Sequence, residues 1–129
     1  NFANPDMVAH TGSMDATIKA VESVDTAIGQ IARSVLKKDG CLLITADHGN
    51  AEEVKNLQTG EMDKEHSTNP VPFYVIANSL EGEPGPSGDA PNGDLSLLPP
   101  VGLLSDVAPT MLKLMGIDPP EDMTGHSLI

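Results

Sequence analysis

The sequence predicts an α/β fold in which helices cover both faces of a sheet, and three stretches support this. Residues 41–46, CLLITA, form an unbroken apolar run, which is typical of a strand buried on both faces inside a parallel sheet. Residues 73–77, FYVIA, form a second such run, and residues 13–39 have helical periodicity. Because the helix leads straight into strand 41–46, it reads as half of a βαβ unit whose first strand would precede residue 1. We therefore expect a cut through a larger protein and a sheet that is incomplete without its N-terminal half.

The helix at 13–39 is predicted from apolar residues that recur at intervals of three and four, between Ser13 as a cap and Gly40 as a stop. These residues are Met14, Ile18, Val21, Val24, Ile28, Ile31, Val35 and Leu36. Charged residues lie between them, so one face is expected to pack and the other to meet water.

The remaining elements are shorter. Asn4 followed by Pro5 suggests an N-cap with proline in the first turn, which predicts a helical turn over 5–10. Pro70 and Pro72 exclude the middle of a sheet, so the second strand is expected to begin near Phe73. We also expect a short helix over 51–57, an exposed flexible loop at about 79–100, and an apolar helix that Ser105 caps and Gly116 ends.

Composition limits the possible functions. The formal net charge is -12, with 7 basic residues against 19 acidic ones, which argues against binding nucleic acid or an anionic membrane surface. The single cysteine, Cys41, is expected to be a small core residue in a reducing compartment. Since no apolar run approaches membrane-spanning length and no signal peptide is visible, we expect a cytoplasmic protein.

Candidate chemistry begins where strand 41–46 ends, at Asp47 and His48. Ligands of open α/β sheets bind beyond the carboxyl ends of the strands, so an acid next to an imidazole there is a candidate metal or catalytic pair. The plainer alternative is that Asp47 caps the following turn and His48 is an ordinary loop residue.

Two further segments offer ligands. Asp6 and His10 stand one helical turn apart, close enough to hold one ion, although Asp6 could instead only favour the helix dipole. His66 lies on a loop before the second strand, where it has several possible hydrogen-bonding roles besides binding metal. His126 has no acid or histidine beside it in a ligand spacing, so we expect it to be structural.

These five ligands, Asp6, His10, Asp47, His48 and His66, mix carboxylate and imidazole groups. Such a set suits Mn, Zn or Co better than Ca, which prefers oxygen alone. Five ligands are too many for one ion with an open position and too few for two.

Four segments carry a resemblance to a known family: NFANPDMVAHTG, LLITADHGNAEE, HSTNPVPF, and LLSDVAPTMLKLMGIDPPEDMTGHSLI. In this order they resemble the C-terminal part of cofactor-independent phosphoglycerate mutase, a member of the alkaline phosphatase superfamily. The resemblance covers nearly the whole chain except the loop at about 79–100. Ala9 stands where family members usually have glycine, which is a small departure.

The resemblance implies an alkaline-phosphatase-like sheet and an isomerase of glycolysis and gluconeogenesis that interconverts 3-phosphoglycerate and 2-phosphoglycerate through a phosphoserine. It implies two divalent ions, manganese first, with zinc, cobalt or magnesium as alternatives. Asp6, His10 and His66 would hold one ion, and Asp47 with His48 the other. The nucleophilic serine and the remaining metal ligands belong to the family's N-terminal part. The resemblance therefore implies no catalytic residue in this chain. Residues 1–129 would be the C-terminal part of the metal-binding domain.

The requirements of phosphoryl transfer are consistent with a chain that supplies only the metal ligands. Phosphoryl transfer requires an activated nucleophile, charge compensation and cationic groups that hold the substrate. Arg33 and the lysines are expected to lie away from the ligand motifs, so this chain alone should not turn over phosphoglycerate.

Two alternatives stay open at this point: a different superfamily phosphomutase or hydrolase, such as a phosphopentomutase-like enzyme, and a non-catalytic metal-binding module. The complete enzyme is expected to be a monomer with a small-molecule substrate, whereas exposed sheet edges could make the isolated chain self-associate.

Overall fold

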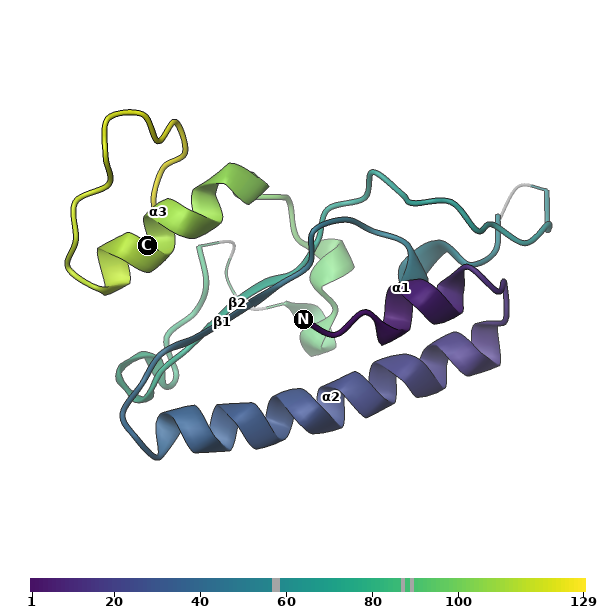
Figure 1. The fold of residues 1–129 in the computed structure, drawn as a ribbon, viewed down its shortest axis with the longest axis horizontal. Helices are drawn as coiled ribbons and strands as arrows, with labels where there is room; N and C mark the ends of the chain where they lie inside the picture. Colours follow the sequence, from purple (N-terminus) through teal and green to yellow (C-terminus); the bar gives the residue numbers. More distant parts are fainter. Residues whose placement is uncertain (57–58, 87, 89) are drawn as a thin grey trace. The chain divides into compact units, whose positions relative to one another are not determined.

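The computed structural model describes residues 1–56, 59–86, 88 and 90–129, and the chain divides into two compact units, Asn1–Ser79 and Leu80–Ile129. The first unit contains helices α1 (Asn4–Ala9) and α2 (Met14–Leu36) and strands β1 (Leu42–Thr45) and β2 (Phe73–Ile76) (Figure 1). The second contains helix α3 (Val107–Leu114). The predicted α/β class is therefore confirmed.

Both N-terminal helices form close to the predicted positions. Pro5 stands in the first turn of α1, as expected, but the N-cap is Ala3 and Asn4 is already helical. Ser13 is the N-cap of α2, and its carbonyl oxygen accepts a hydrogen bond from the Thr17 hydroxyl at 2.9 Å. The helix ends at Leu36, three residues before the predicted end, because Asp39 adopts a left-handed conformation with φ 54°.

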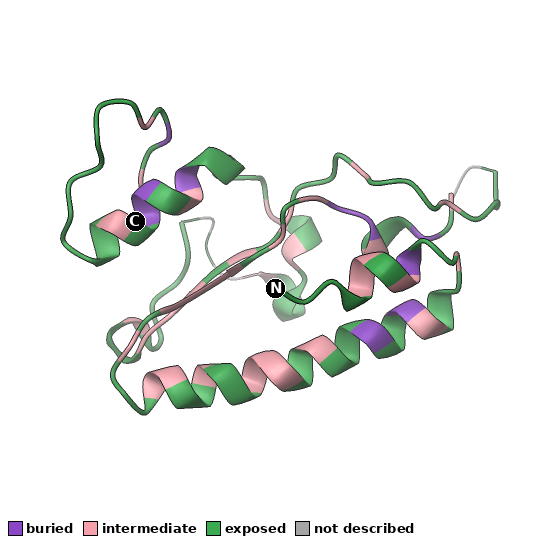
Figure 2. Ribbon diagram, viewed as in Figure 1, coloured by how far each residue is buried: buried purple, intermediate pink, exposed green. Residues whose placement is uncertain are grey.

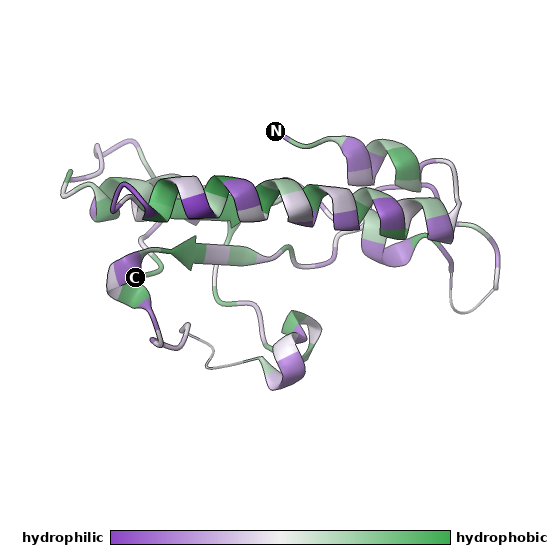
Figure 3. Ribbon diagram, turned by 90° about the horizontal axis from the view of Figure 1, so that it is seen from below, coloured by the Kyte–Doolittle hydropathy of each residue, from purple (hydrophilic) through white to green (hydrophobic). Residues whose placement is uncertain are grey.

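The packed face of α2 is narrower than its periodicity predicts. Thr17 and Ala20 are buried near the start of the helix, where α2 packs against α1 and its buried Ala9 (Figure 2). Small side chains at this crossing allow the two helices to approach closely. Apolar residues nevertheless recur along the whole of α2 (Figure 3), and four of those expected in the core are exposed: Met14, Ile18, Val21 and Ile31.

Strands β1 and β2 pair antiparallel, with Leu42 opposite Ile76 and Thr45 opposite Phe73. Both strands lie where the apolar runs predicted them. The expectation that the first would be buried on both faces in a parallel sheet is wrong for the described residues, since β1 is only half-buried and its partner runs antiparallel. The expectation that Cys41 is a core residue is also wrong, because Cys41 is exposed and precedes β1. A sheet with two described strands cannot cover its own faces.

The loop between the strands begins with a single 3-10 turn, Ala51–Glu53, rather than the short helix expected over 51–57, whose last residue lies outside the described part. Val54 follows this turn and is 1% exposed. Its neighbour Lys55 forms an antiparallel bridge with Met62. Val54 is therefore the residue of this loop that is buried in the interior of the first unit.

We expect Val54→Ala to lower the free energy of unfolding of the chain by about 2 kcal/mol, because it removes buried methyl groups and leaves a cavity. Urea unfolding followed by circular dichroism measures this. Val101→Ala is the control, since Val101 is 50% exposed and should change stability by less than about 0.5 kcal/mol. Equal losses in the two variants would contradict the assignment of Val54 to the core.

In the second unit, a 3-10 turn (Leu104–Asp106) leads directly into α3, and Gly116 with φ 69° follows the helix end as predicted. The predicted Ser105 cap is wrong, because Ser105 lies inside the 3-10 turn. Instead, the Asp106 carboxylate accepts hydrogen bonds from the backbone N–H groups of Leu103 at 2.8 Å and His126 at 2.9 Å. The acid thus holds the C-terminal segment beside the start of the helix.

These two backbone hydrogen bonds, the one from Leu103 and then the one from His126, lower the pKa of Asp106 below its ordinary value of 3.8. A carboxyl whose pKa is lower in the folded state stabilises the fold above the unfolded pKa, and this contribution is lost as the pH falls through the folded pKa. We therefore expect the melting temperature to fall as the pH is lowered below 3.8, and to fall less in Asp106→Asn, which is already less stable at neutral pH. The exposed Asp118 provides the control, because Asp118→Asn should keep the full acid response of the unchanged chain.

In the part of the chain that the structure describes, no helix is both long enough and apolar enough to span a bilayer.

Candidate metal centre

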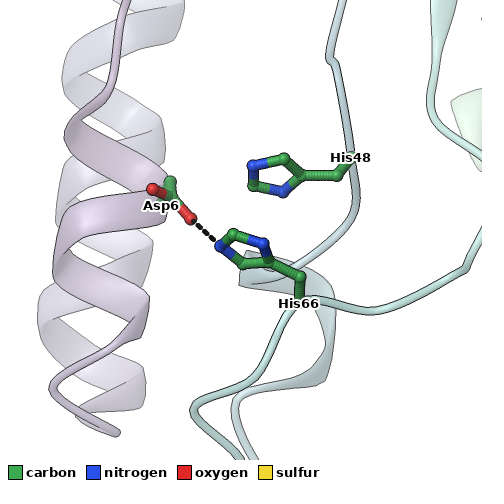
Figure 4. Close-up of side chains that lie close together, drawn as sticks. All are labelled: Asp6, His48 and His66. Atoms are coloured by element: carbon green, nitrogen blue, oxygen red, sulfur yellow. Dashed lines mark ion pairs between the residues drawn. The ribbon is translucent and has the colours of Figure 1, made fainter.

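Three side chains from separate segments of the first unit converge: Asp6 of α1, His48 after β1, and His66 before β2 (Figure 4). One ligand atom from each lies within 4.8 Å of the other two. Asp6 and His48 are half-buried and His66 is exposed. The fold thus brings together residues that stand far apart in the sequence, within the distances that one metal ion can bridge.

His10 belongs to the same cluster. Its Nε2 atom lies 3.3 Å from Asp6 Oδ1 and 3.2 Å from His66 Nε2, and the latter atom lies 3.2 Å from Asp6 Oδ1. The one-turn spacing of Asp6 and His10 therefore places both on the same side of the helix, as predicted. The His48 ring stacks on that of His66, with ring centroids 3.8 Å apart.

The backbone sets the orientation of the His10 ring. Its Nδ1 atom lies 2.5 Å from the carbonyl oxygen of Lys64. Because a carbonyl can only accept a hydrogen bond, Nδ1 carries the hydrogen, and in the neutral ring Nε2 carries the lone pair. That lone pair faces Asp6 and His66, which is the arrangement of a metal-binding histidine held by an outer partner.

Asn50 is a site residue that the sequence analysis missed. It is 4% exposed, and its amide nitrogen donates to Asp6 Oδ1 at 2.9 Å and lies 3.4 Å from His10 Nε2. The hydrogen bond from Asn50 is the main cause that lowers the pKa of Asp6, opposed by burial and helped by the nearby histidines. In the sequence, the signal was a polar residue directly after Gly49, just beyond the end of a predicted strand.

Asp47 is the predicted ligand that the structure leaves outside the cluster. Its side chain is 88% exposed, and its Oδ1 atom lies 3.8 Å from His48 Nε2. Four of the five predicted residues therefore come together, with the fifth beside them. Its pairing with His48 on a second ion stays a prediction.

The donor set fits a divalent transition metal. One carboxylate and three imidazoles place possible ligand atoms close together, and mixed oxygen and nitrogen ligands suit Zn, Mn or Co better than Ca. In addition, the Asn50 side-chain oxygen is buried without a hydrogen-bond partner in the described structure. Asp6, His48 and Asn50 also line a cleft of about 270 Å³, which gives an ion and its further ligands room.

The comparisons with known proteins agree with this chemistry. A 2,3-bisphosphoglycerate-independent phosphoglycerate mutase of Clostridioides difficile is 48% identical over 100% of this chain and 23% of its own length, and one of Clostridium botulinum is 50% identical over 100% and 22%. The predicted resemblance is confirmed, and it includes the loop at about 79–100 that we had excluded. The chain spans under a quarter of the length of these relatives.

The comparison with solved structures also finds a phosphoglycerate mutase. A crystal structure of Leishmania mexicana phosphoglycerate mutase at low cobalt concentration matches 99% of this chain and 24% of its own, with a TM-score of 0.72 and 31% identity. The family profile described as "Metalloenzyme superfamily" matches residues 1–119. The chain therefore belongs to the metalloenzyme superfamily.

Proposed function

We propose that this chain supplies the divalent-metal site of a phosphoglycerate mutase that interconverts 3-phosphoglycerate and 2-phosphoglycerate through a phosphoserine intermediate. The observation that carries the proposal is the convergence of Asp6, His10, His48 and His66, in a chain 48–50% identical to phosphoglycerate mutases. Glycolysis and gluconeogenesis use this reaction, and the cytoplasm is the proposed location.

Two divalent ions are proposed, with manganese first and zinc, cobalt or magnesium as alternatives. Asp6, His10 and His66 would hold one ion, and His48 with the exposed Asp47 would hold the other. When bound, such ions offset negative charge on phosphoryl oxygens and make a hydroxyl group easier to ionise. Asn50 and the Lys64 carbonyl orient Asp6 and His10 from outside.

The rest of the machinery is proposed to come from other sequence. The nucleophilic serine and the cationic groups that hold phosphoglycerate would lie in the part of the relatives that this chain does not cover. We propose that residues 1–129 all belong to one metal-binding domain. The flexible loop expected at about 79–100 includes residues 87 and 89, which lie outside the described residues. The complete enzyme is proposed to be a monomer, and the chain alone to self-associate through its exposed sheet edges.

Metal titration and an activity assay together test the proposal. Isothermal titration of the purified chain with MnCl₂ and CoCl₂ should show saturable binding, because the ligand cluster lies within one unit. A coupled mutase assay of the same sample should show no turnover above background. If the chain bound neither Mn²⁺ nor Co²⁺, the proposed metal site would be wrong. Turnover well above background would contradict the proposal that the nucleophile and the substrate-binding groups lie in other sequence.

A further inference from the structure

The carboxylate of Glu52 connects the two loops that carry His48 and His66. Its Oε1 atom accepts hydrogen bonds from the Ser67 hydroxyl and, at 3.1 Å, from the Asn69 amide. Its Oε2 atom accepts the backbone N–H of Asn50 at 2.8 Å. Glu52 therefore bonds to one residue on the His48 side and to two on the His66 side.

The backbone of these loops meets at the same place. Gly49 and Ser67 form an antiparallel bridge, in which the Ser67 N–H donates to the Gly49 carbonyl at 2.7 Å. Each bridge residue directly follows a histidine of the cluster. The stacking of the His48 and His66 rings, at 3.8 Å and 19°, thus depends on how closely the two loops are held.

A carboxylate is the group that these contacts require. Asn50, Ser67 and Asn69 all donate, and an ionised carboxylate only accepts. Burial opposes ionisation of Glu52, but hydrogen bonds from Ser67, Asn69 and the backbone outweigh it, so the pKa of this carboxyl lies below its ordinary value of 4.5. A glutamine would turn its NH₂ group toward one set of donors and lose that side.

We infer that Glu52 is a positioning residue that clasps the 47–50 and 66–69 loops and thereby sets the spacing of the His48 and His66 ligand atoms. The inference rests on the proposed metal-binding function. Glu52 itself is not one of the cluster's ligands. Its removal should change both the metal affinity and the geometry of the histidine pair.

Glu53 offers a matched control. It is adjacent in the chain and carries the same charge, and its Oε2 atom accepts one hydrogen bond, at 3.1 Å, from the Asn69 amide. Glu53→Gln and Glu52→Gln therefore change the net charge equally. They differ in that Glu52→Gln disturbs the bonds to Asn50 and Ser67, which join the two loops.

The first experiment is a cobalt titration of the chain, followed by visible absorption of bound Co²⁺. We expect Glu52→Gln to weaken Co²⁺ binding roughly 10–100-fold, the range for outer partners of metal ligands, and to change the absorption band. Glu53→Gln should bind as the unchanged chain does. Equal binding and equal spectra for all three proteins would overturn the inference, whereas an unchanged chain that binds no cobalt would overturn the proposed function instead.

The second experiment needs no metal. Proton NMR of the metal-free chain reports the stacking of His48 on His66 through the chemical shifts of the ring protons. These chemical shifts should change in Glu52→Gln and stay the same in Glu53→Gln. Unchanged chemical shifts in both variants would overturn the inference that Glu52 positions the two loops. If Glu52→Gln is unfolded, Ser67→Ala takes its place, because it removes the clasp from the other loop and should move the same signals.

Discussion

Replacing His66 with alanine is expected to weaken Co²⁺ binding by the chain by more than about 100-fold, beyond the range for outer partners of ligands. His66 stands at the centre of the cluster: its Nε2 atom is 3.2 Å from Asp6 Oδ1 and 3.2 Å from His10 Nε2, and its ring stacks on His48. Its loss removes one ligand and the contact that holds a second. Isothermal titration at constant pH measures the affinity.

His126→Ala is the matched control for this experiment. His126 lies in the second unit, and its hydrogen bond to Asp106 is made by the backbone N–H, which alanine keeps. The control variant should therefore bind Co²⁺ as the unchanged chain does. If His66→Ala bound cobalt with unchanged affinity, Asp6, His10 and His48 would suffice and the central position of His66 would be wrong.

Replacing Gly49 with alanine is expected to lower both the stability of the chain and its affinity for metal. A methyl group at this position would overlap the Ser67 hydroxyl and the Glu52 carboxylate. The Ser67 or the Glu52 side chain would have to turn away, which breaks the hydrogen bond between them that joins the two loops. We expect a loss of about 1–3 kcal/mol in the free energy of unfolding, as for overpacking elsewhere, together with weaker metal binding.

Gly85→Ala separates this clash from the general effect of removing a glycine. Among the described residues, no atom lies within 4 Å of a methyl group at Gly85, and its φ is not in the left-handed region. That change should be neutral or stabilise the chain by up to about 1 kcal/mol through the unfolded state. Urea unfolding and Co²⁺ titration of both variants are the measurements, and a Gly49→Ala protein as stable as the unchanged chain would contradict the close approach.

Local sequence signals predicted the elements well. Apolar runs located β1 and β2 to within a residue at each end, and spacing located α1 and α2. They did so because strand and helix patterns depend on neighbours in the chain. Burial was predicted less well: Cys41 and Ile18 are exposed although their patterns indicated a core, because burial depends on what packs against them.

The same distinction applies to the site. Asp6 and His10 could be paired from the sequence, because one helical turn joins them. Asn50 and Glu52 could not be identified in this way, since their roles arise from partners up to 44 residues away. A polar residue in a loop has many possible partners, and its sequence neighbours do not select among them.

By itself, the sequence determined the α/β class, the positions of the main elements, the types of candidate ligand and the family resemblance. Each of these depends on local periodicity or on motifs read along the chain. Only the tertiary structure decided that His48 stacks on His66 beside Asp6, that Asp47 stays exposed, and that Glu52 clasps two loops. The physical reason is that these contacts are set by strand pairing and helix packing between distant segments, which fix side-chain distances that no local pattern encodes.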